Sequence, residues 1–184
     1  MQILEMVRQA ERVIGELVAF VPPEGDGLYL EFGVASGTTI HRIAVTTKNK
    51  VYGFDSFQGL PEDWEGYIEV KGAYACDIPT GLPENVELVV GLFEDTLPKF
   101  LKKHKENVTF LHIDCDIYSS TKCIFDNLKK RIVPGTVIAF DELYGYPNWE
   151  QHEYRAFKEF LAETKYNVEC IGKFGAHQAA FKIL

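Results

Sequence analysis

Five short apolar runs, each followed at once by an acid or a glycine, most constrain what this chain can fold into. The runs are LYLEF, VYGF, VELVV, VTFLHI and TVIAF. Short runs rich in β-branched and aromatic residues are typical of strands buried on both faces of a parallel sheet. We therefore predict strands at 28–33, 51–55, 86–91, 108–114 and 136–141.

The segments between these runs carry apolar residues at helical spacing. We predict helices at 2–20, from Thr38 onward, and at 96–106, 121–132 and 152–165. The pair Pro22-Pro23 is expected to stop the first helix. A hydroxyl side chain is expected to cap the helix at 121–132, supplied by Ser119, Ser120 or Thr121.

The chain ends in two apolar runs, at 167–173 and 177–184, that only three residues separate. Three residues are too few for a right-handed crossover, so the last strand should run antiparallel. The predicted fold is α/β: a Rossmann-like, doubly wound, mostly parallel seven-stranded sheet ending in an antiparallel hairpin, in a single domain of residues 1–184. Residues 56–84 form a long, Gly- and Pro-rich connection, which predicts a lid or binding loop.

Composition excludes several classes of protein. The net charge of −8 argues against a general nucleic-acid binder, which would show a basic surface. The four cysteines form no C-x-x-C pair and suit neither zinc nor a disulfide framework, as in a cytoplasmic protein. Charged residues interrupt the apolar residues of 2–20, so we expect neither a signal peptide nor a membrane span.

The segment EFGVASG predicts a ligand loop, because its alternate small residues let the backbone approach a ligand closely. Asp55 follows Gly33 by 22 residues, near the spacing at which an acid reaches ribose hydroxyls. Ala35 and Thr38 stand where a dinucleotide motif needs glycine, which disfavours a nicotinamide cofactor. S-adenosylmethionine fits better, with Glu31 or a backbone group at its amino-acid end.

A second site is indicated by the acids that follow the fourth and fifth runs. Asp114 and Asp116 point to the same side of an extended chain, and Asp141 and Glu142 should arrive from the neighbouring strand. Such carboxylates repel one another unless one is protonated or a cation intervenes. Oxygen ligands favour Mg²⁺, with Mn²⁺ or Ca²⁺ as substitutes. A D-x-D glycosyltransferase that holds Mn²⁺ and a nucleotide diphosphate is an alternative interpretation of these acids.

Five segments in order, EFGVASG, FDSFQGLPEDW, VVGLFEDTLP, HIDCDIYSST and VIAFDELYG, resemble the class I S-adenosylmethionine-dependent methyltransferases of the macrocin O-methyltransferase family. The resemblance runs from about Tyr29 to Tyr146. It implies Mg²⁺-dependent methylation of a hydroxyl on a sugar or similar small polyol. Two positions depart from the family pattern: Cys115 replaces a glycine, and Glu142 replaces an aspartate.

The resemblance also implies roles for individual residues. Asp114, Asp141 and Glu142 would bind the metal, and Asp116 would be the catalytic base. The candidate cofactor-binding residues are Glu31, Gly33, Ser36, Gly37, Asp55, Ser56, Phe93 and Asp114. A non-catalytic protein that binds S-adenosylmethionine is a further alternative.

Several weaker candidates flank these sites. Tyr118 and His152 are candidate substrate contacts, and Trp64 and Trp149 are candidate walls for a sugar or ring. His112 is interpreted as a core histidine rather than a base. The expected partner is a small hydroxyl acceptor, with neither nucleic acid nor membrane, and a homo-oligomer is possible.

Overall fold

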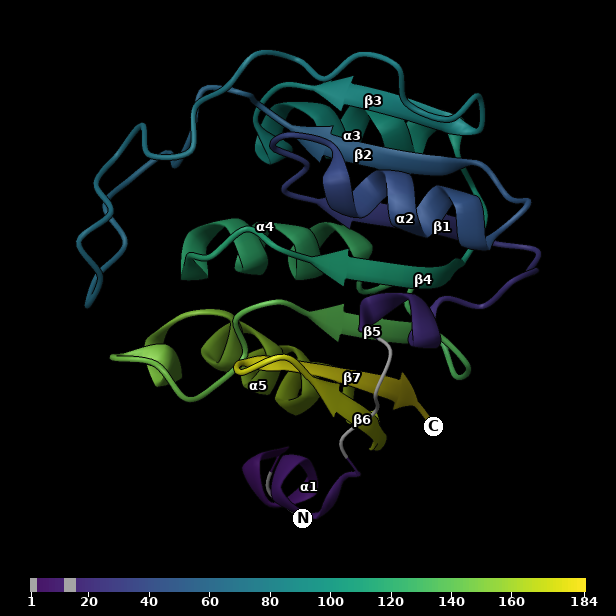
Figure 1. The fold of residues 1–184 in the computed structure, drawn as a ribbon. Coiled ribbons are helices and arrows are strands. Elements are labelled where there is room, and N and C mark those ends of the chain that lie inside the picture. Colours follow the sequence, from purple (N-terminus) through teal and green to yellow (C-terminus); the bar gives the residue numbers. More distant parts are fainter. Residues whose placement is uncertain (1–2, 12–15) are drawn as a thin grey trace.

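The computed structural model describes residues 3–11 and 16–184. It contains a seven-stranded sheet in the order β3-β2-β1-β4-β5-β7-β6, in which β7 runs antiparallel to both β5 and β6 (Figure 1). The other pairs are parallel, so the predicted sheet with a terminal hairpin is confirmed. The strands are β1 Leu28–Phe32, β2 Val51–Asp55, β3 Val86–Val90, β4 Val108–Ile113, β5 Val137–Phe140, β6 Val168–Phe174 and β7 Gln178–Ile183.

Helices cover both faces of the sheet and form a separate core on each (Figure 1). One face carries α2 (Thr38–Thr46) with the 3-10 turn η1 (Leu17–Phe20). The opposite face carries α1 Ile3–Gln9, α3 Phe93–Lys103, α4 Tyr118–Leu128 and α5 Glu153–Thr164. A short 3-10 turn, η2 (Trp149–Gln151), precedes α5. None of the helices in the described ranges has the length and apolar character needed to cross a bilayer.

The N-terminal segment differs from the single helix predicted for residues 2–20. Helix α1 ends at Gln9, and residues 12–15 lie outside the described part of the chain. Ile3 and Val7 pack into the core on one face of the sheet, whereas Leu17 and Phe20 pack into the core on the other. The segment is divided because one straight helix cannot bury apolar residues against both faces of a sheet.

Two helix starts also differ from the sequence prediction. Helix α3 begins at Phe93, three residues before the predicted 96–106. Helix α4 begins at Tyr118 with Ile117 at its N-cap, which makes no side-chain cap, so the predicted hydroxyl cap is wrong. The hydroxyl of Thr121 instead donates to the Ile117 carbonyl at 3.1 Å, inside the first turn.

The connection between β2 and β3 contains no helix or strand in the described chain and projects beyond the carboxyl ends of the parallel strands (Figure 1). It folds back on itself, because the Leu60 N–H donates to the Ala73 carbonyl at 2.9 Å and the Trp64 N–H donates to the Glu69 carbonyl at 3.0 Å. We call residues 56–84 the lid loop. Its position places it over the edge of the sheet where ligands bind in open α/β folds.

Candidate active site

A cavity of about 550 Å³ lies beyond the carboxyl ends of β1, β2 and β4, beside the point where the strand order reverses. This volume falls within the usual range for small-molecule sites. The lid loop, the start of α3 and the acids that follow β4 and β5 all contribute to its wall. Its lining includes Gly33, Ala35, Asp55, Ser56, Leu60, Trp64, Tyr67, Tyr74, Phe93, Asp114, Asp116 and Glu142.

Asp55 holds the ligand loop in place. Its Oδ2 accepts the backbone N–H groups of Val34 and Ala35, both at 2.8 Å, and its Oδ1 accepts that of Phe57 at 2.8 Å. Gly33 has a φ of +91°, and a Cβ there would meet the Asp114 carbonyl oxygen at 1.6 Å. The loop after β1 therefore needs glycine at this position to pass against the loop after β4.

The predicted cofactor residues divide into two groups. Gly33, Asp55, Ser56, Phe93 and Asp114 line the cavity. The other three are placed elsewhere. Ser36 pairs through its hydroxyl with that of Thr38 at 3.0 Å, and Gly37 is the N-cap of α2. Glu31 is fully buried and lies 3.0 Å from the imidazole of His112.

Asp114, Asp116 and Glu142 form one cluster at the cavity wall, each with a carboxylate oxygen within 4.8 Å of the others. Burial, followed by repulsion from Asp141, raises the pKa of Asp116 to about 7 and that of Glu142 to about 12. The same two causes raise the pKa of Asp114 well above its usual range. Asp116 also has a φ of +67°, a backbone strain of a kind that is often found at functional sites.

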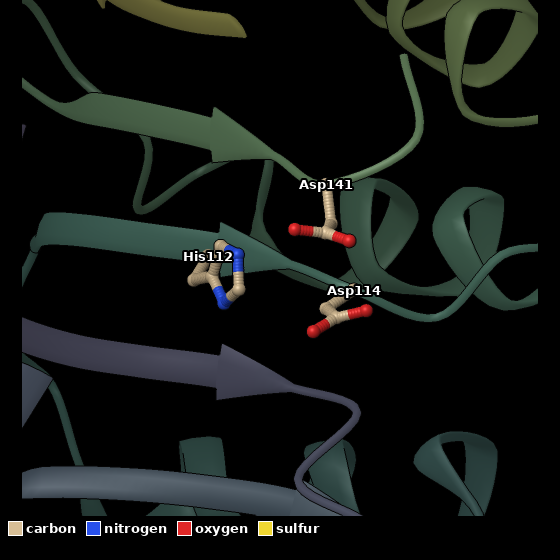
Figure 2. Close-up of side chains that lie close together, drawn as sticks. All are labelled: His112, Asp114 and Asp141. Atoms are coloured by element: carbon tan, nitrogen blue, oxygen red, sulfur yellow. The ribbon is translucent and has the colours of Figure 1, made fainter. Parts of the chain in front are cut away.

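A second cluster lies behind the first and consists of His112, Asp114 and Asp141 (Figure 2). Two hydrogen bonds position Asp141. Its backbone N–H donates to the Ile113 carbonyl at 3.0 Å, and the side-chain amide of Gln178 donates to Asp141 Oδ1. His112 is fully buried, and burial lowers its pKa. The sequence interpretation of His112 as a core histidine missed this proximity, although its place two residues before Asp114 was an available signal.

The three predicted metal ligands are thus shared between two clusters that have Asp114 in common. In the described part of the chain, none of these carboxylates forms an ion pair with a lysine or arginine. Glu142 Oε2 is buried and has no hydrogen-bond partner among the described residues. Several buried carboxylates without a counter-charge fit a divalent cation, because a cation relieves both their repulsion and their lost hydration.

Sequence reasoning missed a further carboxylate. Glu153, the first residue of α5, is fully buried, and neither of its oxygens has a well-formed hydrogen bond within the described residues. Burial raises its pKa well above the usual range, and the charges of Asp116 and Asp114 raise it further. An acid in the first turn of a helix looks like an ordinary dipole partner in the sequence, so nothing there indicated its burial.

The lid loop is fixed to the rest of the molecule through aromatic side chains. Trp64 is buried, stacks on Tyr67 with ring centroids 4.4 Å apart, and meets Tyr146 edge to face at 5.8 Å. The Nε2 of His152 lies 2.8 Å from the Glu65 carbonyl oxygen and can donate to it. Of these aromatic residues, Trp64 and Tyr67 line the cavity.

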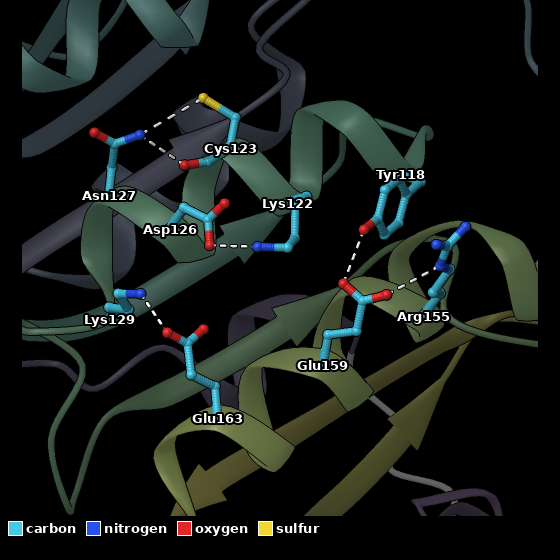
Figure 3. Close-up of polar contacts among 9 residues, drawn as sticks. All are labelled: Tyr118, Lys122, Cys123, Asp126, Asn127, Lys129, Arg155, Glu159 and Glu163. Carbon is cyan, nitrogen blue, oxygen red and sulfur yellow. Dashed lines mark hydrogen bonds and ion pairs between the residues drawn. The ribbon is translucent and has the colours of Figure 1, made fainter.

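Two other predicted substrate contacts lie apart from the cavity lining. The Tyr118 hydroxyl donates to Glu159 at 2.8 Å (Figure 3). The Arg155 guanidinium lies 4.2 Å from the centroid of the Tyr118 ring. Trp149 packs edge to face against Tyr154, with centroids 4.7 Å apart. These contacts join α4 and η2 to α5, so both side chains contribute to packing between helices.

The chain belongs to a methyltransferase-domain family, whose model matches residues 30–143. No curated protein sequence matches the chain. Among solved structures, CalS11, a calicheamicin methyltransferase, is 22% identical, with a TM-score of 0.70 over 85% of this chain and 72% of its own. Its apo structure, described as that of a TDP-rhamnose 3'-O-methyltransferase, is 25% identical, with a TM-score of 0.61 over 90% of this chain and 73% of its own.

Two further solved structures share the fold. The O-methyltransferase NovP is 23% identical, with a TM-score of 0.64 over 97% of this chain and 78% of its own. MycE, a mycinamycin-pathway methyltransferase solved with Mg and SAH, is 12% identical, with a TM-score of 0.58 over 88% of this chain and 46% of its own. The family and these structures establish a methyltransferase fold around the cavity.

Proposed function

We propose that this protein is an S-adenosylmethionine-dependent O-methyltransferase of the macrocin O-methyltransferase type. It would require Mg²⁺ or Mn²⁺ and act on a hydroxyl of a sugar or similar small polyol. The observation that carries the proposal is one shared cavity, which Asp55 and Gly33 line together with Asp114, Asp116 and Glu142. A nucleoside site and an acidic centre then face the same space. The structural neighbour CalS11, described as a TDP-rhamnose 3'-O-methyltransferase, supports this substrate class.

Bound S-adenosylmethionine would supply a methyl group on a positively charged sulfur. The ligand loop would hold its ribose at Asp55, whose oxygens keep lone pairs beyond the three backbone contacts. The acceptor hydroxyl must lose its proton as its oxygen forms the bond to the methyl carbon, while the bond from that carbon to sulfur breaks and S-adenosylhomocysteine leaves. Asp116 would accept that proton, because it lines the cavity and its pKa of about 7 suits a general base near neutral pH.

Asp114, Asp141 and Glu142 would hold the metal. A divalent cation there would supply positive charge that lowers the pKa of neighbouring hydroxyls and orients them. The lid loop would exclude water from the acceptor through Leu60 and Trp64, which are buried at the cavity wall. The arrangement then separates two tasks between neighbouring carboxylates of the two clusters: binding the metal and taking the proton.

The D-x-D glycosyltransferase interpretation predicts a different ligand and gives a direct test. In calorimetric titration the protein should bind S-adenosylhomocysteine. Its affinity for a nucleotide sugar, measured in the absence of S-adenosylhomocysteine, should be much lower. Methyl transfer should then be measured as S-adenosylhomocysteine formation with nucleotide sugars and simple vicinal diols, in the presence of Mg²⁺. Failure to bind S-adenosylhomocysteine would remove the basis of the proposal.

A further inference from the structure

His112 has two ring nitrogens, and one of them is unpaired within the described part of the chain. The side chain has 0% exposure, and Nε2 makes no hydrogen bond among the described residues. An unpaired polar atom in the interior destabilises the fold, so a retained one calls for an explanation. The two carboxylates of Asp114 and Asp141 lie beside the same ring, and Figure 2 shows its nitrogen-bearing edge turned toward them.

Strand register aligns these groups. Glu31 on β1 is the direct register partner of His112 on β4, and Asp114 follows His112 on the same side of the sheet. Asp141 follows Phe140, whose register partner on β4 is Ile113. Three adjacent parallel strands therefore direct Glu31, the imidazole and two aspartates to neighbouring positions at one edge.

The contact between Glu31 and His112 determines what the free nitrogen can do. Nδ1 lies 3.0 Å from Glu31 Oε1, and both side chains have 0% exposure. When Nδ1 carries the proton and donates it to the carboxylate, Nε2 presents a lone pair. Histidines that bind metals commonly make this contact through their other nitrogen, which fixes the tautomer and the ring orientation.

We propose that His112 is a nitrogen ligand of the divalent cation, together with Asp114 and Asp141, and that Glu31 is its outer hydrogen-bond partner. The proposal rests on the metal centre of the proposed function. It replaces an all-oxygen donor set with a mixed one, and it assigns Glu31 to the metal rather than to the cofactor. Imidazole nitrogen suits transition ions better than Mg²⁺, so His112 should shift the centre toward Mn²⁺ and the later divalent ions.

The decisive experiment uses the unaltered protein loaded with Mn²⁺ alone. Pulsed electron paramagnetic resonance reports nitrogen nuclei bound to Mn²⁺, and protein labelled with ¹⁵N only in histidine identifies their source. We expect a ¹⁴N coupling in unlabelled protein that is replaced by a ¹⁵N coupling in the labelled sample. Mn²⁺ bound without any nitrogen coupling would overturn the inference and leave the metal-dependent function standing. No Mn²⁺ binding at all would overturn both.

Two variants assign the signal to this residue. His112→Gln should lose the nitrogen coupling and reduce the preference for Mn²⁺ over Mg²⁺ in calorimetric titration. Glu31→Gln should keep a coupling but weaken Mn²⁺ binding about 10–100-fold, the usual effect of removing an outer partner. His41→Gln, at an exposed position of α2, is the matched control and should change neither. A nitrogen coupling that persists in a folded His112→Gln protein would reject His112 as its source.

Discussion

The carboxyl edge of the sheet carries two kinds of carboxylate, and they differ in how their oxygens are satisfied. Asp55, after β2, accepts three backbone N–H groups at 2.8 Å, so its charge is stabilised before any ligand binds. Across the switch point, Asp114, Asp116 and Glu142 lie within reach of one another and have raised pKa values. Lysine and arginine form no ion pair with them in the described chain.

This difference separates structure from reactivity. The ligand loop can form by itself, because one side chain supplies the acceptors that its backbone needs. The acidic centre is costly in the free protein, since burial and mutual repulsion both oppose ionisation. Ionisable groups with strongly shifted pKa values concentrate at functional sites. This cluster faces the cavity, as expected for a group of side chains that acts on a ligand.

The largest expected effect is on turnover and tests the acidic centre. Asp116→Asn should lower the methylation rate by about 10²–10⁴, because an amide cannot take the hydroxyl proton. Mn²⁺ affinity should change little, since Asp116 is not among the proposed ligands. The measurement pairs turnover with a metal titration, and Asp126→Asn at an exposed site of α4 is the control. Parental turnover in Asp116→Asn would rule out its role as the base.

Metal should stabilise the folded protein and restore activity. At about 100 times its dissociation constant, Mn²⁺ should raise the free energy of unfolding by about 2.7 kcal/mol. Asp114→Asn should lose most of this gain because Asp114 belongs to both clusters. Denaturant titrations with chelator and with Mn²⁺ measure the difference, and turnover should disappear in chelator and return with Mg²⁺ or Mn²⁺. An equal gain in the variant, or full activity in chelator, contradicts the assignment.

The satisfied carboxylate should affect stability and cofactor binding together. Asp55→Ala leaves three N–H groups without their acceptor and should lower the free energy of unfolding by about 1–3 kcal/mol. It should also reduce the thermal stabilisation by S-adenosylhomocysteine. Asp77→Ala, at an exposed position of the same lid loop, is the control. If Asp55→Ala is destabilised yet binds S-adenosylhomocysteine as the parent does, Asp55 serves the loop alone.

The smallest expected effect is a pH dependence of stability without metal. Burial raises the pKa of Glu153 in the folded state, so that state holds a proton which the unfolded chain releases near the ordinary glutamate value. Stability should therefore be highest at low pH and fall as pH rises toward the folded pKa, by at most about 1.4 kcal/mol per pH unit for this group.

Glu153→Gln removes that titration and should flatten the fall in the free energy of unfolding between about pH 5 and pH 8, measured in chelator. Glu163→Gln, at an exposed position of the same helix, is the control. An unchanged slope in Glu153→Gln would show that Glu153 does not retain its proton in the folded protein.

Local patterns in the sequence were sufficient to predict the architecture. Apolar runs of strand length, helical periodicity between them and a three-residue final turn gave the doubly wound sheet with its hairpin, because these signals depend on neighbouring residues. The same reasoning placed Asp55, Asp114 and Asp141 at one edge, since parallel strands present their carboxyl ends together. The sequence did not predict that the N-terminal segment packs against two different faces of the sheet. The spacing of its apolar residues is the same whichever face they pack against.

Only the tertiary structure decided which side chains meet. Glu31 and His112 are 81 residues apart and become partners through the register of β1 and β4. Glu153 approaches Asp116 only because α5 packs its first turn inward, behind the β4 loop. Sequence determines which residue types stand at strand ends, whereas burial, register and helix docking determine which of them share a hydrogen bond, a charge or a cation.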